Sequence, residues 1–230
     1  MRISKQIGIF FALDATLSLA YLGNYFAGEP HWLVSIMLDL DGEDSVCAWY
    51  SSIKFFCIFL LGLLFASKKY NPKNTSTYLL FGLPAIFLFF SIDESVMIHE
   101  WLGLFSDRFL PEGTRKATIF HETGIWMFVL GIPFLIVFSW LAYLTKSHFA
   151  EYPGSLTKIV TGMMILLLGA LGIETVGNFE DGSAIVYMLQ VFFEESFEML
   201  GATIMLWGMY ETTVEYLPFF ESPIRGTDAE

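Results

Sequence analysis

Charge is scarce in this 230-residue sequence: only 16% of its residues are Asp, Glu, Lys or Arg, whereas a soluble domain has about 25%. Basic residues are the scarcer kind, with 12 Lys and Arg against 24 Asp and Glu and a formal net charge of −12. No basic patch is visible, so nucleic acid is not an expected partner. With 55% hydrophobic residues, the composition also excludes a disordered chain and disfavours a soluble globular domain.

Cysteine is almost absent as well. The two cysteines, Cys47 and Cys57, are ten residues apart. On a single helix that separation corresponds to about 15 Å along the axis, which is too far for a disulfide. The sequence therefore predicts no disulfide between them.

What the sequence has instead is a series of apolar blocks of about 20 residues, the length that crosses a hydrocarbon core of about 30 Å. The segments predicted to span a membrane are 7–27, 46–67, 77–98, 118–145, 157–178 and 184–210. The first is interpreted as a retained span, because it is long, contains Asp14 and lacks a convincing cleavage site. The predicted fold class is an all-α polytopic bundle of about six transmembrane helices, with one domain over 1–215 and a cytoplasmic tail over 216–230.

The positions of Lys and Arg predict the orientation, because cytoplasmic loops favour basic residues. With the N-terminus inside, the inner segments hold Arg2, Lys5, Lys68, Lys69, Lys73, Lys146, Lys158 and Arg225. The outer loops then hold only Arg108, Arg115 and Lys116. Both termini are therefore expected in the cytoplasm and the protein in the cell inner membrane. Its expected partners are the lipid bilayer and other membrane subunits.

Acidic residues inside the spans form the most informative pattern, because such residues are costly there and mark functional sites. They fall late in the third and fifth segments and early in the fourth and sixth, so the alternating direction of the spans places them all in the outer half. The layer comprises Asp93, Glu94, Glu122, Glu174, Glu194, Glu195 and Glu198, with His99 and His121 near them. Carboxylates in a low dielectric must hold protons or a cation. Protonated acids that serve structure or proton transfer therefore remain an alternative to a metal site.

Helix geometry selects candidate ligands within this layer. Glu194 and Glu198 share a helix face, whereas Glu94 and His99 do not unless the helix ends between them. The predicted metal ligands are Glu94, His121, Glu174, Glu194 and Glu198, with His99, Glu122 and Glu195 as second choices. These ligand types suit iron, manganese or zinc. The inventory matches that of di-iron carboxylate bundles, but their Glu-x-x-His spacing does not occur in these spans.

Two further patterns predict packing rather than chemistry. Asp14 in the first segment and Lys54 in the second lie at similar estimated depths and are predicted to form a structural ion pair. Small residues along the fifth segment predict a face for close helix packing, formed by Gly162, Gly169 and Gly172.

The segment between the first two spans has an apolar part and an acidic part. The apolar part, 31–38, is compatible with lying along the membrane interface. The acidic part, 39–44, resembles a fragment of a calcium loop but lacks the full ligand spacing. A solvated acidic turn is the favoured interpretation.

Three stretches resemble a family of uncharacterised bacterial multipass membrane proteins. They are Asp39-Leu40-Asp41-Gly42-Glu43 with Trp49-Tyr50-Ser51-Ser52, then Asp93-Glu94 with His99-Glu100, and Glu194-Glu195-Ser196-Phe197-Glu198-Met199-Leu200-Gly201. The resemblance implies the membrane architecture and carries no activity and no residue roles.

The leading functional hypothesis is an integral membrane protein with a divalent-metal site in its outer half that acts on a lipid-soluble substrate. The alternatives are a proton- or cation-coupled transporter and a non-catalytic subunit of a membrane complex. Spans four and five offer little polar lining below the acidic layer, which counts against transport. Whether the protein is an enzyme is left open.

Overall fold

The computed structural model describes residues 4–121, 123–179 and 182–213, and these form helices and loops with no strand among them. The longer helices are α1 (Lys5–Phe26), α3 (Val46–Lys69), α5 (Gly82–Val96), α7 (Ile132–Thr145), α8 (Pro153–Leu167) and α10 (Ala184–Thr213). The shorter ones are α2 (Trp32–Leu38), α4 (Ser76–Leu79), α6 (Ile98–Ser106) and α9 (Glu174–Gly177). π-helical turns at Met127–Gly131 and Leu168–Ile173 adjoin α7 and α8. Short 3-10 turns occupy Asp107–Phe109, Pro111–Gly113, Arg115–Ala117 and Lys146–Phe149. The all-α prediction is confirmed for the described residues.

Five helical stretches in the described part of the chain are long and apolar enough to cross a membrane, as expected of a membrane protein. They are Lys5–Phe26, Val46–Lys69, Ser76–Val96, Met127–Phe149 and Gly154–Gly177. They correspond to five of the six predicted segments. The 30-residue α10 covers the sixth, but Glu194, Glu195 and Glu198 interrupt its apolar sequence.

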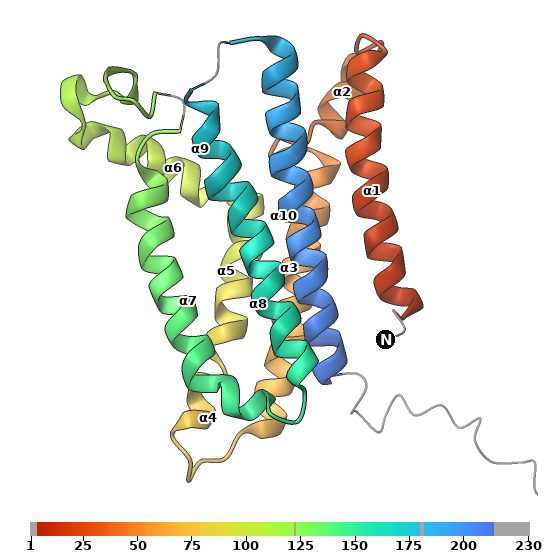
Figure 1. Cartoon of the computed structure of the whole chain (residues 1–230), viewed down its shortest axis with the longest axis vertical. Helices are drawn as coiled ribbons and strands as arrows, with labels where there is room; N and C mark the ends of the chain where they lie inside the picture. Colours follow the sequence, from red (N-terminus) through yellow and green to blue (C-terminus); the bar gives the residue numbers. More distant parts are fainter. Residues whose placement is uncertain (1–3, 122, 180–181, 214–230) are drawn as a thin grey trace, which may run out of the picture.

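The long helices stand roughly side by side, with α10 between α1 and α8 and in contact with α3 (Figure 1). Helices α2, α6 and α9 lie at one end of the bundle, called the cavity end from here on. Helix α4 lies at the opposite end, called the closed end. Helix α1 is peripheral, because its buried residues are only Ile7, Asp14 and Ser18.

Helices α8 and α10 approach closely at glycines. A Cβ atom on Gly162 would lie 2.5 Å from the carbonyl oxygen of Gly201, and one on Gly201 would lie 2.5 Å from that of Gly162. A Cβ on Gly169 would lie 2.6 Å from the carbonyl oxygen of Glu194. The predicted small-residue face therefore holds for Gly162 and Gly169. Gly172 faces only Leu168 of its own turn.

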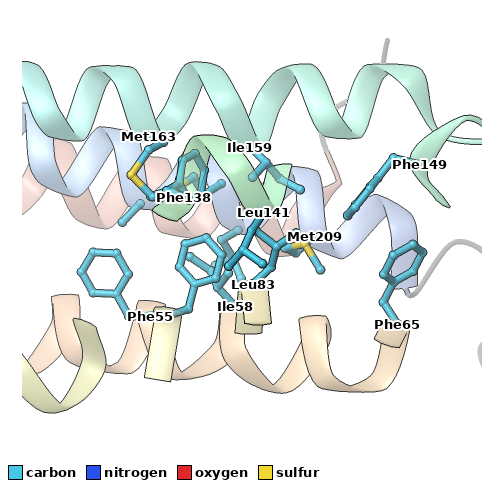
Figure 2. Packing of buried hydrophobic residues seen from close by; sticks show 14 of the residues in the cluster. Phe55, Ile58, Phe65, Leu83, Phe138, Leu141, Phe149, Ile159, Met163 and Met209 are labelled. Carbon is cyan, nitrogen blue, oxygen red and sulfur yellow. The ribbon is translucent and has the colours of Figure 1, made fainter. Parts of the chain in front are cut away.

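An apolar core fills the bundle toward the closed end. Figure 2 shows Phe55, Ile58 and Phe65 of α3 facing Ile159 and Met163 of α8. All five side chains are buried. Van der Waals contacts between these apolar side chains hold the helices together. The hydrophobic effect contributes little between helices in a membrane, because lipid is itself apolar.

The predicted fourth segment, 118–145, is wrong at its beginning. Helical structure starts only at Trp126, directly before the π-helical turn at Met127–Gly131, and residues 123–125 form turns. Gly124 has a φ of +72°, a backbone conformation that suits glycine and does not continue a right-handed helix. Thr123 is also held away from the helix, because its backbone N–H donates to Asn178 Oδ1 at 3.2 Å.

Candidate functional site

A cavity of about 570 Å³ lies at the cavity end, between α3, α5, α7, α8 and α10. This volume falls within the range of small-molecule sites, about 300–1,000 Å³. The acidic side chains that line it are Asp41, Glu43, Asp93, Glu94, Glu100, Glu174, Glu194, Glu195 and Glu198. His99 and Arg115 are the basic side chains among its lining residues. Asp41 and Glu100 are exposed, which places them at the mouth.

Most of the residues predicted from the sequence meet in this cavity. Its lining includes Glu94, Glu174, Glu194 and Glu198 of the first set, and His99 and Glu195 of the second choices. His121 is exposed and does not line the cavity, because it precedes the helical turn that enters the bundle. Glu122 lies outside the described residues. That these carboxylates bind a metal stays a prediction.

A break between α5 and α6 brings His99 to the cavity. Met97 separates the two helices and adopts a left-handed backbone, with φ 59° and ψ 40°. This conformation is unfavourable for a non-glycine residue by about 1–3 kcal/mol, and such strain is concentrated at functional sites. The His99 backbone N–H donates to Asp93 Oδ1 at 2.8 Å, and His99 Nδ1 lies 2.9 Å from Asp93 Oδ2. The chain thus folds His99 back over the end of α5.

The closest grouping of metal-ligand atoms is at the mouth of the cavity. Glu43, His99 and Glu100 each offer one ligand atom, and these atoms lie within 4.8 Å of one another. Asp93 contacts His99 Nδ1, so Nε2 is the nitrogen expected to face a metal. A carboxylate behind a histidine ligand fixes the ring orientation and raises its basicity. The group therefore has the chemistry of a divalent-metal site.

The electrostatics of the mouth are dominated by negative charge. Burial raises the pKa of Glu43 to about 7, although the charge of His99 opposes this shift. Burial lowers the pKa of His99, but the hydrogen bond and charge of Asp93, with the charges of Glu43 and Glu100, outweigh it and raise the pKa to about 9. At neutral pH and without a metal, the His99 ring is therefore protonated on both nitrogens and positively charged. A metal ion would have to displace one of these protons to bind the ring.

The two π-helical turns adjoin two residues that line the cavity, Trp126 and Glu174. Trp126 precedes the first and Glu174 follows the second. Trp126 Nε1 donates to Glu174 Oε1 at 3.0 Å, and the Trp126 ring centroid lies 5.1 Å from that of His99. π-helical turns shift the register of side chains and recur at functional sites. Here they flank a continuous contact from Glu174 through Trp126 to His99.

Sequence reasoning missed Glu43. The interpretation of 39–44 as a solvated turn holds for Asp44, which is exposed, but not for the half-buried Glu43. Tyr187 Oη of α10 donates to Asp41 Oδ2 at 2.8 Å and so holds this loop against the bundle. The sequence contained one indication of Glu43, because this residue belongs to the first of the three stretches that resemble the family.

Asp14 and Lys54 lie in contact apart from the cavity lining. Lys54 Nζ is 2.9 Å from Asp14 Oδ1 and donates to the carbonyl oxygen of Met199 at 3.0 Å. Tyr50 Oη donates to the same Asp14 oxygen at 2.9 Å. These bonds connect α1, α3 and α10, and Lys54 is fully buried.

Comparison with protein families places the chain in a group without an assigned function. The model of the family described as a domain of unknown function, DUF8692, matches residues 9–214, and the chain belongs to this family. No curated protein and no solved structure matches the chain. The functional argument therefore depends on the geometry of the cavity.

Proposed function

We propose that this protein is a membrane protein that binds a divalent metal ion at the mouth of its acidic cavity, through Glu43, His99 and Glu100. The observation that carries the proposal is the convergence of their three ligand atoms within 4.8 Å. A second observation supports it: Asp93 contacts His99 at the nitrogen opposite the one expected to bind. Two carboxylates with one imidazole suit iron, manganese or zinc.

The proposal assigns the imidazole to His99 in place of His121. The remaining predicted ligands, Glu94, Glu174, Glu194 and Glu198, share the cavity with the three mouth residues. Buried in a low dielectric, these carboxyl groups must hold protons or a cation, and the proposal assigns them no direct bond to the ion.

The proposal includes six spans, with α10 as the sixth. Its 30 residues extend about 45 Å, and three of its acids, Glu194, Glu195 and Glu198, line the cavity. Both termini are placed in the cytoplasm and the cavity end at the outer face of the cell inner membrane. This orientation puts Lys68 and Lys69, at the end of α3, on the cytoplasmic side. The single domain over 1–215 is part of the proposal, and the tail over 216–230 lies outside the described residues.

The cavity lining favours a binding site over a conducting route. On the side of the closed end, the lining residues are apolar and include Phe55, Phe134 and Leu166. An ion that moved onward from the carboxylates would meet these side chains in place of water or polar ligands, at a high free-energy cost.

Metal analysis tests the proposal. The full chain, purified without chelator and then equilibrated with Mn²⁺ or Zn²⁺ and desalted, should retain about one ion for each chain. Both His99→Ala and Glu43→Gln should lose this ion. Asp44→Asn changes an exposed acid of the same loop and should retain it. Retention by His99→Ala and Glu43→Gln, or no retention by the wild type, would contradict the proposal.

A further inference from the structure

The cavity has polar and apolar lining, and three of its walls change from polar to apolar in the same direction. On α5, Glu94 lies nearer the cavity end than Phe90 and Phe89. From Glu174 back to Leu166 the lining changes from carboxylate to aliphatic over eight residues, about 12 Å of helix. The first change from polar to apolar lies within α5, and the second lies within α8 and the π-helical turn that follows it. Both stretches line the same cavity in the folded protein.

The third wall shows the same order. Trp126 lies near Glu174, and the lining then continues through Leu130 to Phe134 toward the closed end. On these three walls the lining changes along the bundle axis from polar side chains at the cavity end to aromatic and aliphatic side chains below, whereas α10 contributes Glu194, Glu195 and Glu198. A purely ionic ligand would leave the lower zone unused.

Helix α6 places the mouth at the level of a membrane interface. It has only nine residues and is too short to span. Its residues His99 and Gly103 line the cavity, whereas Trp101 and Phe105 are 65% and 52% exposed. An exposed face with Trp and Phe is typical of a helix that lies in the interfacial plane.

Two apolar lining residues also belong to the exposed surface. Leu104 of α6 and Phe89 of α5 line the cavity and are 55% and 43% exposed. Exposure of these apolar side chains to water would carry a free-energy cost, whereas beside lipid they form an apolar entrance. The entrance they suggest is at the side of the bundle, next to the acyl chains of the outer leaflet.

We infer that the cavity takes a single-chain amphiphile from the membrane, with its anionic head on the bound metal ion and its acyl chain along Phe89, Phe90 and Phe134. This inference rests on the proposed function, because Glu43, Asp93 and Glu100 at the polar end of the cavity would repel an anionic head without the cation. The head is a carboxylate or a phosphate, both of which a divalent cation binds through oxygen.

Photo-crosslinking of the full chain in proteoliposomes tests the inference. The probes are a fatty acid and a lysophosphatidic acid, each with a diazirine in its chain, and they distinguish a carboxylate from a phosphate source. With Mn²⁺ present, we expect saturable labelling of peptides that contain Phe89–Phe90 or Phe134, competed by the unlabelled amphiphile. Labelling of the outward-facing Trp140, which is 56% exposed, should rise without saturation.

A matched pair of variants separates the cavity from the lipid-facing surface. Ala170 lines the cavity, whereas Ala85 is exposed on α5 and does not line it. Ala170→Phe, and the milder Ala170→Leu, should lose the saturable labelling and keep the metal. Ala85→Phe should keep both.

The outcomes for the metal and for the amphiphile are read separately. If the metal binds but labelling does not saturate, or if Ala170→Phe and Ala170→Leu label as the wild type does, the inference is overturned and the metal site stands. If chelation leaves saturable labelling unchanged, the head does not bind the metal and the inference is likewise overturned. If the wild type retains no metal, the proposed function itself fails.

Discussion

Buried charge is arranged in two different ways in this bundle. Away from the cavity lining, buried charges occur as pairs: Lys54 with Asp14 at 2.9 Å, and Lys158 with Glu211 at 2.7 Å. At the cavity end, carboxylates gather around a hollow space in which His99 and Arg115 are the basic lining residues. Arg115 is itself paired with Asp107 at 2.7 Å. The paired charges connect helices of the fold, whereas we propose that the gathered ones serve a ligand site.

The two ends also differ in packing. Toward the closed end, aromatic and aliphatic side chains fill the space between helices, and glycines let α8 and α10 touch. At the cavity end, the helices contain a left-handed residue at Met97 and two π-helical turns. Irregular backbone persists only when the surrounding structure holds it. The closely packed core toward the closed end therefore stabilises a fold that contains irregular backbone at the cavity end.

Removal of one partner of a paired charge should have the largest effect. Lys54→Met should destabilise the protein by about 3–5 kcal/mol, because it leaves the Asp14 carboxylate buried without its cation. The double change Asp14→Asn with Lys54→Met should recover most of the loss. Unfolding in mixed micelles measures both. A double variant as unstable as the single one would show that the pair is not what stabilises this site.

The next largest effect concerns the glycine contact. Gly201→Ala should cost about 1–3 kcal/mol, because the added Cβ overlaps the backbone of α8. Gly23→Ala is the control, since a Cβ there meets nothing within 4 Å. The control should be neutral or stabilising by up to about 1 kcal/mol through helix propensity. Equal stability of the two variants would argue against close packing of α8 on α10.

At the cavity end, Asp93→Asn tests the orientation of His99. We expect metal affinity to fall about 10–100-fold with little loss of stability, as for other carboxylates that hydrogen-bond a metal-binding histidine. Asp44→Asn, an exposed acid nearby, should leave the affinity unchanged. Competition with a metal-binding dye measures the affinities. Wild-type affinity in Asp93→Asn would mean that the carboxylate does not position the ring.

The pH dependence of metal binding should have an effect of similar size. Since the pKa of His99 is raised to about 9, its proton must leave when a metal binds, and affinity should rise about tenfold for each pH unit from 7 to 9. Below pH 7, protonation of Glu43, whose pKa is about 7, should steepen the dependence. The acidic groups that act on His99 are Asp93, Glu43, Glu100, Glu94 and Glu174. A flat profile between pH 7 and 9 would exclude His99 as a ligand.

Much of the helical architecture was predictable, because apolar length is a local property of the sequence. The error at 118–125 has a physical reason. Ile119 and Phe120 are apolar but lie before the helix, and hydrophobicity alone does not distinguish such a loop from a span. Gly124 was the only local indication of the turn.

The choice between His99 and His121 was not predictable in the same way. Their depths estimated from the sequence are similar, and the structure separates them by where helices end. The end of α5 lies at Met97, a residue with no preference for a left-handed backbone. Asp93 then holds His99 toward the cavity.

The sequence by itself determined that this chain is a set of apolar helices with carboxylates concentrated at one depth, because depth follows from 1.5 Å of rise for each residue. Only the tertiary structure decided which side chains meet. The direction in which a side chain points around the bundle depends on helix breaks, π-helical turns and the glycine contact of α8 with α10. The break at Met97 and the hydrogen bond from Tyr187 to Asp41 bring Glu43 of a loop to His99 and Glu100 of α6, and His121 lies before the helical turn, outside the cavity lining.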